Sequence, residues 1–205
     1  MIEIFDNLLP KYVLKDIQEY YFSPFCEWNY QDNITVNYHQ RDSQDQSGLG
    51  SFGFNIGLFD SENLQHNPSY VGILSRSILY AAKTKVEEIY NGSYRLVRAR
   101  ADMTVYNPEK HMHSIHTDLE YFGEPIKHIT CIFYMNDSDG CTTIFDRDGT
   151  TLLKEIEPVE NRLLVFDGRL PHVGFSPAKN KNRVLININF MEENDFQEFR
   201  RKLEY

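Results

Sequence analysis

Three residues of the sequence, His116, Asp118 and His172, have side chains that bind transition-metal ions. One residue separates His116 from Asp118, so on an extended strand their side chains point to the same face. An imidazole and a carboxylate can then approach one ion from one side, and His172 on another strand can supply a third ligand. Two histidines and one carboxylate on one face leave the opposite coordination positions open. A histidine and an aspartate at this spacing are common by chance. The surrounding sequence must therefore show whether the pattern indicates a metal site.

The segments downstream of Asp118 follow an informative order. They are HITCIFYMN at 128–136, GCTTIF at 140–145, NRLLVF at 161–166, the Pro171-His172 pair and RVLININF at 183–190. This order resembles the 2-oxoglutarate- and Fe(II)-dependent oxygenases, and most closely their prolyl-hydroxylase branch. The resemblance covers about residues 95–190. It departs from the usual pattern at Cys141, where many members have a second glycine, and in everything before residue 94.

The resemblance implies a double-stranded β-helix (jelly-roll) core and an enzyme that holds Fe(II) through His116, Asp118 and His172. Such an enzyme uses O₂ and the cosubstrate 2-oxoglutarate, and releases succinate and CO₂ as it oxidises a substrate. Related halogenases lack this carboxylate, so the presence of Asp118 implies hydroxylation or another ordinary oxygenation rather than halogenation. The expected substrate is a prolyl residue of a peptide or protein. A small molecule such as a free amino acid is the alternative, and a non-catalytic jelly-roll binding or structural module is the alternative from another class.

A basic residue is expected to bind the far carboxylate of 2-oxoglutarate. Arg183 lies eleven residues after His172, and a guanidinium binds a carboxylate at two points without losing its charge. The resemblance also places Tyr134 and Tyr106 against 2-oxoglutarate. Asn187, four residues after Arg183, is expected on the same side of its strand, and Thr130 is a further candidate for this pocket.

Other polar residues near these motifs have weaker signals. Arg100 and Asp102 alternate with apolar residues, and we expect them either to contact the substrate or to form a surface ion pair with each other. His111 and His113 precede the metal motif in a loop and are interpreted as surface or rim residues. His128 opens a strand and is interpreted as structural.

Hydrophobic periodicity predicts a mainly β protein with flanking helices. We predict one domain: residues 1–93 support the core, residues 94–190 form it, and residues 191–205 carry a C-terminal helix. The Gly-containing polar segment 40–50 is expected to be either a surface loop or a mobile lid over the active site. Helices are predicted at 10–23, 69–90 and 194–203. Strands are predicted at 2–9, 34–38, 52–56, 94–106, 115–120, 128–136, 142–146, 151–155, 162–167, 171–175 and 182–190.

Composition limits the possible partners and compartments. The formal net charge of −9 disfavours nucleic acid as the main partner, because phosphate binding needs a basic face. The three cysteines have no metal-finger spacing, and an odd number fits a reducing compartment. No run reaches the roughly 20 apolar residues of a membrane span, and the first residues do not resemble a signal peptide. The sequence therefore predicts a cytoplasmic protein without a membrane partner, and its oligomeric state stays open.

Overall fold

A large antiparallel sheet forms the centre of the protein. The computed structural model describes residues 1–34, 51–60 and 65–203. Within these ranges the sheet has the strand order β1-β11-β8-β13-β5-β3-β2, and β4 pairs with β3 at one side. Its strands are β1 (Ile2–Phe5), β2 (Asn29–Gln31), β3 (Gly53–Asp60), β4 (Gln65–His66), β5 (Tyr94–Val105), β8 (Ile129–Tyr134), β11 (Arg162–Asp167) and β13 (Asn182–Glu192).

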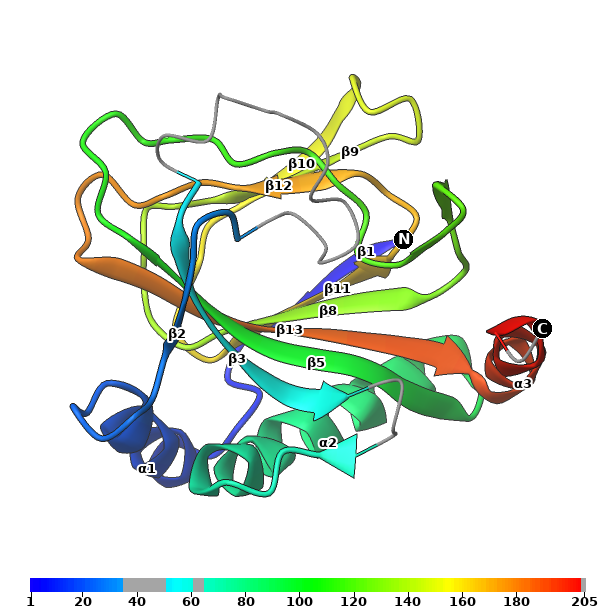
Figure 1. Cartoon of the computed structure of the whole chain (residues 1–205), viewed down its shortest axis with the longest axis horizontal. Coiled ribbons are helices and arrows are strands. Elements are labelled where there is room, and N and C mark those ends of the chain that lie inside the picture. Colours follow the sequence, from blue (N-terminus) through cyan, green and yellow to red (C-terminus); the bar gives the residue numbers. More distant parts are fainter. Residues whose placement is uncertain (35–50, 61–64, 204–205) are drawn as a thin grey trace.

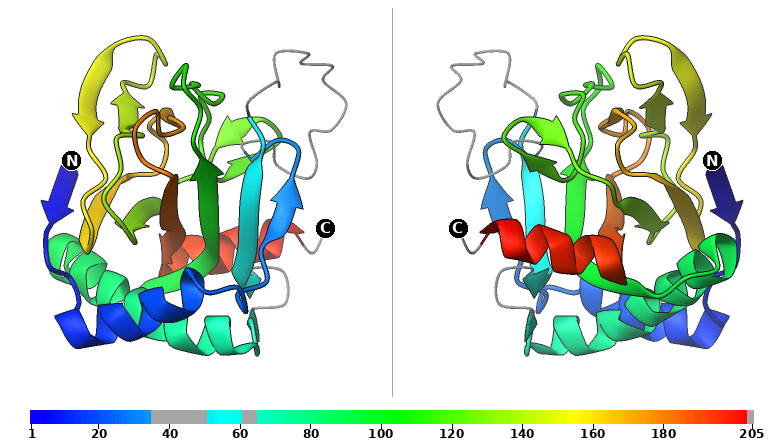
Figure 2. Two further views of the ribbon diagram at one scale, coloured as in Figure 1. Left: turned by 90° about the vertical axis from the view of Figure 1, so that its left-hand side faces the viewer. Right: turned by 90° about the vertical axis from the view of Figure 1, so that its right-hand side faces the viewer.

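A smaller sheet lies across one face of the large one (Figure 1). It has the order β10-β9-β12, formed by β9 (Thr142–Phe145), β10 (Leu152–Ile156) and β12 (His172–Gly174). A two-stranded hairpin of β6 (Glu120–Tyr121) and β7 (Glu124–Pro125) lies outside both sheets. An apolar cluster that includes Ile132, Ile144, Ile156 and Leu164 joins the two layers. Figure 2 shows the N-terminal strand β1 at the edge of the molecule, beside β11.

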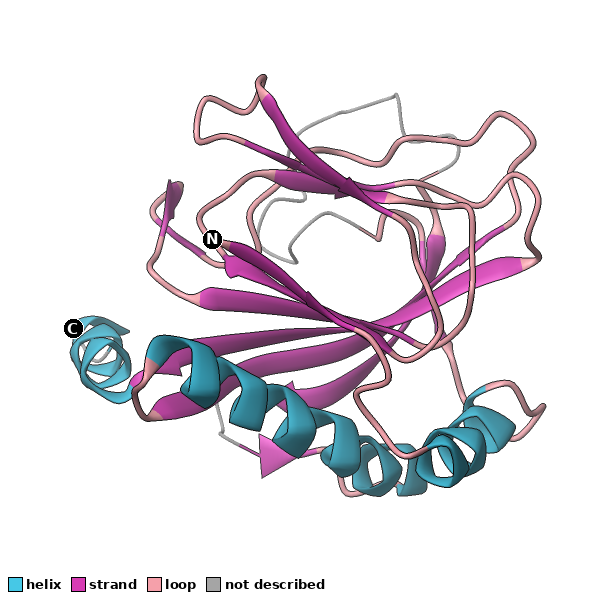
Figure 3. Ribbon diagram, turned by 180° about the vertical axis from the view of Figure 1, so that it is seen from behind, coloured by secondary structure: helices cyan, strands magenta, loops and turns pink. Residues whose placement is uncertain are grey.

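Helices cover the other face of the large sheet (Figure 3). Helix α1 (Lys11–Tyr21) buries Leu14, Ile17 and Tyr21, and α2 (Tyr70–Tyr90) buries an apolar stripe that includes Ile78, Ala82 and Val86. Both stripes belong to one core cluster with residues of β3, β5, β8 and β13. Helix α3 (Glu193–Leu203) follows β13 directly. The predicted helices and the mainly β class are therefore confirmed.

The central strands present apolar side chains to the helices and polar side chains to the smaller sheet. On β13, Val184, Ile186 and Ile188 belong to the core beneath the helices. Arg183 and Asn187 alternate with them and therefore face the other way. Strand β5 repeats this pattern. Period-two alternation on neighbouring strands thus places polar groups together inside the molecule.

Some expected elements differ from the structure. The predicted strand 115–120 is wrong in extent: only an isolated bridge at His116 and the short strand β6 form there. The predicted lid at 40–50 and nearly all of the predicted strand at 34–38 lie outside the described residues. Among the described residues, no helix is both long and apolar enough to cross a membrane.

Candidate active site

His116 and His172 face each other across an antiparallel bridge. The His116 amide donates to the His172 carbonyl at 3.1 Å, and the His172 amide donates back at 2.9 Å. The two imidazole centroids are 4.6 Å apart. Asp118 approaches the same point: Oδ1 lies 3.9 Å from Nε2 of His116, and Oδ2 lies 3.8 Å from Nε2 of His172. The structure thus gathers one ligand atom from each of the three residues within 4.8 Å of one another.

Backbone carbonyls orient both imidazoles. Nδ1 of His116 lies 3.0 Å from the Ser114 carbonyl, and Nδ1 of His172 lies 3.2 Å from the Leu170 carbonyl. A carbonyl only accepts, so each Nδ1 donates its proton there and each ring is held in one orientation with Nε2 facing Asp118, as in many metal sites. Burial, with a smaller contribution from His172, lowers the pKa of His116 to about 4. The imidazole of His116 is therefore neutral at pH 7 and can act as a ligand.

Three neutral donors hold the buried carboxylate of Asp118. Thr130 donates to Oδ2 at 2.8 Å, Asn187 donates to Oδ1 at 2.9 Å, and Asn189 donates to Oδ2 at 2.9 Å. Burial acts to raise the pKa of Asp118, but His172, His116 and Arg98 together hold it below its ordinary value. The carboxylate is thus charged and fixed in orientation. Thr130, which we expected to line the cosubstrate pocket, instead contacts Asp118 and is absent from the pocket wall.

Arg183 is a buried cation without an acidic partner. Its side chain is 5% exposed, and Nη2 donates to Oγ1 of Thr142 at 2.7 Å. Its guanidinium carbon lies 5.8 Å from the ring centre of Tyr134. Gly174 leaves room beside the guanidinium, since a Cβ there would lie 3.1 Å from Nη1. No ion pair of Arg183 occurs within the described part of the chain, so its charge can pair with an acidic ligand.

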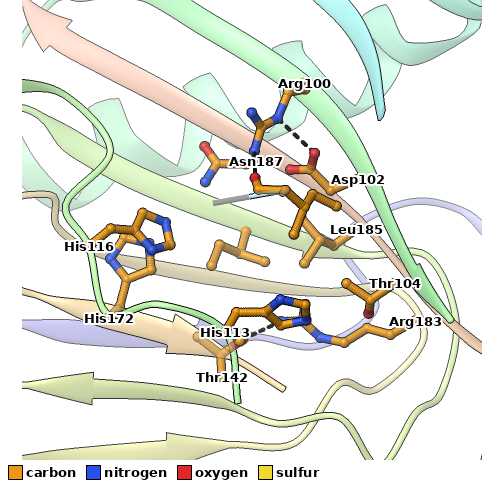
Figure 4. A pocket seen from close by; sticks show the side chains of 13 residues that line it. Arg100, Asp102, Thr104, His113, His116, Thr142, His172, Arg183, Leu185 and Asn187 are labelled. Carbon is orange, nitrogen blue, oxygen red and sulfur yellow. Dashed lines mark hydrogen bonds and ion pairs between the residues drawn. The ribbon is translucent and has the colours of Figure 1, made fainter. Parts of the chain in front are cut away.

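One pocket contains both Arg183 and the two histidines of the cluster (Figure 4). Asn187 lines it as expected. Arg100 and Asp102 also line it, and their Nε and Oδ1 atoms are 2.7 Å apart. They form an ion pair inside the pocket, with Asp102 8% exposed, so the surface ion pair is excluded. The full lining is Ile34, Arg100, Asp102, Thr104, His113, His116, Ile132, Thr142, His172, Gly174, Arg183, Leu185 and Asn187.

The pocket wall contains polar atoms that lack protein partners. Oγ1 of Thr104, Nδ1 of His113, Nε of Arg183 and Oδ1 of Asn187 are buried and have no hydrogen-bond partner among the described residues. Buried polar groups are nearly always satisfied in folded proteins. A polar ligand in this pocket would supply the missing partners.

Two further residues lie elsewhere than expected. Tyr106 is 53% exposed and is not among the residues that line the pocket; it follows the last residue of β5, Val105, and its amide donates to the Lys181 carbonyl at 3.0 Å. His113, which we interpreted as a surface or rim residue, is 3% exposed and lines the pocket. His111 is partly buried and lies outside the pocket wall, 3.1 Å from the hydroxyl of Ser51. His128 is buried against Gly168, as its structural interpretation predicted.

Sequence reasoning also missed Thr104, Thr142 and Asn189. Thr104 and Asn189 could have been found from strand alternation. Thr104 is two residues after Asp102 on β5, and Asn189 is two residues after Asn187 on β13, so each points to the same face as a predicted site residue. Thr142 accepts hydrogen bonds from both Tyr134 and Arg183, at 2.7 Å each. Tyr134 therefore contacts the site through Thr142 and is not itself part of the pocket wall. His113 gave no local signal, because its burial depends on segments far away in sequence.

Comparisons with known proteins support the fold. No family model matches the chain, and no curated protein sequence matches it. A solved structure of a Trichoplax adhaerens prolyl hydroxylase, in complex with a hypoxia inducible factor oxygen degradation domain peptide fragment, is similar in fold. Its TM-score is 0.67 at 12% identity, and the match covers 96% of this chain and 86% of that one.

Two further solved structures are similar to this chain in fold. The α-ketoglutarate-dependent epimerase SnoN from nogalamycin biosynthesis matches with TM-score 0.63 at 11% identity, over 93% of this chain and 78% of that one. A Pseudomonas putida prolyl-4-hydroxylase matches with TM-score 0.56 at 14% identity, over 94% and 92% of the two chains. The chain therefore has the fold of the 2-oxoglutarate–Fe(II) oxygenases. The resemblance seen in the sequence and the predicted jelly-roll core are confirmed at the level of the fold.

Proposed function

We propose that this chain is an Fe(II)- and 2-oxoglutarate-dependent dioxygenase that hydroxylates a substrate C–H bond and releases succinate and CO₂. The observation that carries the proposal is the buried cation of Arg183, which shares one pocket with His116 and His172 of the three-residue cluster. A buried charge without a partner is costly. A dicarboxylic acid that reaches from a metal ion to Arg183 pairs with this charge. It also accounts for the presence of possible metal ligands at one end of the pocket and a cation at the other.

The residues present fit Fe(II) and 2-oxoglutarate. When bound, these two supply the oxidising chemistry. His116 and His172 offer Nε2 and Asp118 offers its carboxylate, while the donors on Asp118 keep that ligand in one orientation. Arg183 binds and orients the far carboxylate, and Thr142 positions the guanidinium. Asp118, His172 and Arg183 are buried between the two sheets, and burial strengthens their electrostatic interactions with bound groups.

The substrate that we propose first is a prolyl residue of a peptide or protein. Two of the structures similar in fold are described as prolyl hydroxylases, one of them in complex with a peptide fragment. In the pocket, Arg100 offers guanidinium donors that suit peptide carbonyl groups. On this account Asp102 orients Arg100 through their 2.7 Å contact.

A free amino acid is a second candidate, and the Arg100–Asp102 pair favours it. The two opposite charges lie side by side in the pocket wall. An amino acid carries a carboxylate and an ammonium group a few bonds apart, which match Arg100 and Asp102 respectively. A prolyl residue inside a peptide has no charge and no N–H, so it offers no partner to Asp102, which then contacts Arg100 alone.

Succinate formation over a substrate panel tests the proposal. The purified protein with Fe(II), 2-oxoglutarate and O₂ is offered prolyl peptides and free amino acids, and succinate and hydroxylated product are measured together. We expect one class to raise succinate formation with matching product, and Asp118→Ala to abolish it. The control Asp16→Ala, an exposed acid on α1, should keep full activity. Binding of 2-oxoglutarate without any substrate-dependent succinate would contradict these substrate classes.

A further inference from the structure

Thr104 lies beside Arg183 in the central sheet. The two residues are register partners on the adjacent strands β5 and β13, so their side chains leave the sheet on the same face. Thr104 is 4% exposed, lines the pocket, and has a hydroxyl without a hydrogen-bond partner among the described residues. Figure 4 shows both side chains at the end of the pocket away from His116 and His172.

His113 lies at the same end of the pocket (Figure 4). Its Nε2 lies 3.2 Å from the hydroxyl of Ser176, and its Nδ1 is buried without a partner. Burial, followed by the charge of Arg183, lowers the pKa of His113 to about 3, so the ring is neutral at pH 7. If the Ser176 hydroxyl donates to Nε2, the single ring proton is on Nδ1, and Nδ1 becomes a donor.

The hydrogen bonds that Thr142 already accepts make its hydroxyl a third donor to the pocket. Its Oγ1 accepts from Tyr134 and from Arg183, which uses both lone pairs of a hydroxyl. The Thr142 proton must then be donated elsewhere, and Thr142 lines the pocket. A guanidinium surrounded by neutral donors matches a carboxylate, which is charged and only accepts.

We propose that Thr104 and His113 are specificity-determining residues that hydrogen-bond the far carboxylate of the bound 2-oxo acid beside Arg183. They make the site select a dicarboxylic over a monocarboxylic 2-oxo acid. This inference rests on the proposed function, since it concerns the same cosubstrate. It assigns two residues whose buried polar atoms, Oγ1 of Thr104 and Nδ1 of His113, have no hydrogen-bond partner within the described ranges.

A ligand pair tests the contact of Thr104. Binding to the Mn(II)-loaded protein is measured by calorimetry under anaerobic conditions for 2-oxoglutarate and for 2-oxopentanoate, which has a methyl group in place of the far carboxylate. We expect Thr104→Val to raise the Kd of 2-oxoglutarate roughly 10- to 100-fold, as for loss of a hydrogen bond to a charged group. The Kd of 2-oxopentanoate should stay within about threefold, because it makes no such bond.

Matched variants separate this contact from a general effect. Thr104→Ser keeps the hydroxyl and should bind 2-oxoglutarate nearly as the wild type does. Thr143→Val removes an equally buried and unpartnered hydroxyl that lies outside the pocket wall, and should leave both affinities unchanged. For the imidazole, His113→Asn places an amide donor near the position of Nδ1, whereas His113→Gln places it near Nε2. We expect His113→Asn to retain more 2-oxoglutarate affinity than His113→Gln.

Several results would overturn the inference. Unchanged 2-oxoglutarate affinity in folded Thr104→Val and His113→Gln would remove both residues from the site. An equal loss for the two ligands would show a general disturbance of the pocket. If Thr104→Val does not fold, the same ligand comparison on Thr104→Ala decides. If Arg183→Gln loses 2-oxoglutarate binding while the Thr104 and His113 variants keep it, this inference is refuted and the proposed function stands. If the wild-type protein does not bind 2-oxoglutarate, both are refuted.

Discussion

Asp118 is the residue on which the metal site depends most. Its two oxygens accept hydrogen bonds from Thr130, Asn187 and Asn189, and none of these donors is charged. A charged donor would neutralise the carboxylate and weaken it as a ligand, whereas neutral donors fix its direction and leave its charge for an ion. The burial of Asp118 and its donors thus favours metal binding over a purely structural role.

Asn189 tests this arrangement one step away from the metal. Its Nδ2 lies 2.9 Å from Oδ2 of Asp118 and 3.2 Å from Oγ1 of Thr130. Asn189→Ala should weaken Mn(II) affinity roughly 10- to 100-fold, the usual effect of removing a group that orients a ligand. Titration of the metal-free protein measures it, with Asn29→Ala on an exposed strand as the control. Wild-type affinity in a correctly folded Asn189→Ala would contradict this role of Asn189.

Substitution of Arg183 by lysine tests whether the planar shape of the guanidinium matters for binding 2-oxoglutarate. Arg183→Lys keeps the positive charge but loses the planar two-point contact and the bond to Thr142. The Kd of 2-oxoglutarate should rise roughly 10-fold or more, while the Kd of Mn(II) changes by less than about twofold. Calorimetry on both ligands checks this, and Arg147→Lys at an exposed position is the control. An unchanged 2-oxoglutarate affinity would mean that another cation binds the far carboxylate.

At the scale of the elements, strand alternation was the most informative sequence feature. It predicted that Arg183 and Asn187 share a face, which their common place in the pocket wall agrees with. It failed for Tyr106. This residue is two positions after Thr104, so alternation would place both on the same face, but Tyr106 lies beyond the end of β5. Alternation gives the face of a residue only while the strand continues. The helices were predictable for a similar local reason, since α1 and α2 carry apolar stripes at helical spacing.

The turn after β11 offers a test of packing between elements. A Cβ on Gly168 would overlap the imidazole of His128, which is 2% exposed and cannot move aside freely. Gly168→Ala should therefore lower the free energy of unfolding by about 1–3 kcal/mol. Gly57 is the matched control, because a Cβ there meets nothing within 4 Å. Gly57→Ala should be neutral or slightly stabilising. Denaturant unfolding measures both, and equal stability of the two variants would contradict the predicted clash.

At the scale of the whole molecule, the pocket exists because the large sheet is covered differently on its two faces. Helices α1 and α2 pack on one face of the large sheet (Figure 3). The polar side chains of the pocket wall therefore lie on its other face, toward the smaller sheet. Contacts between distant segments could not be predicted from local patterns. His113 and Ser176 are 63 residues apart, and they meet because backbone hydrogen bonds join their segments: His113 donates its amide to Gly174, and Ser176 donates its amide to His111. The sequence therefore predicted the fold and the three residues that cluster at His116, Asp118 and His172, but not the full pocket wall.

The central claim is that one pocket holds a metal ion and 2-oxoglutarate together. Anaerobic addition of 2-oxoglutarate to the protein with Fe(II) tests it most directly. The account predicts a weak visible absorption band that saturates with one 2-oxoglutarate per chain, and that is lost in Asp118→Ala. In Arg183→Gln the band should require a much higher 2-oxoglutarate concentration. A folded wild-type protein that binds Fe(II) but gives no such band at saturating 2-oxoglutarate would contradict the account.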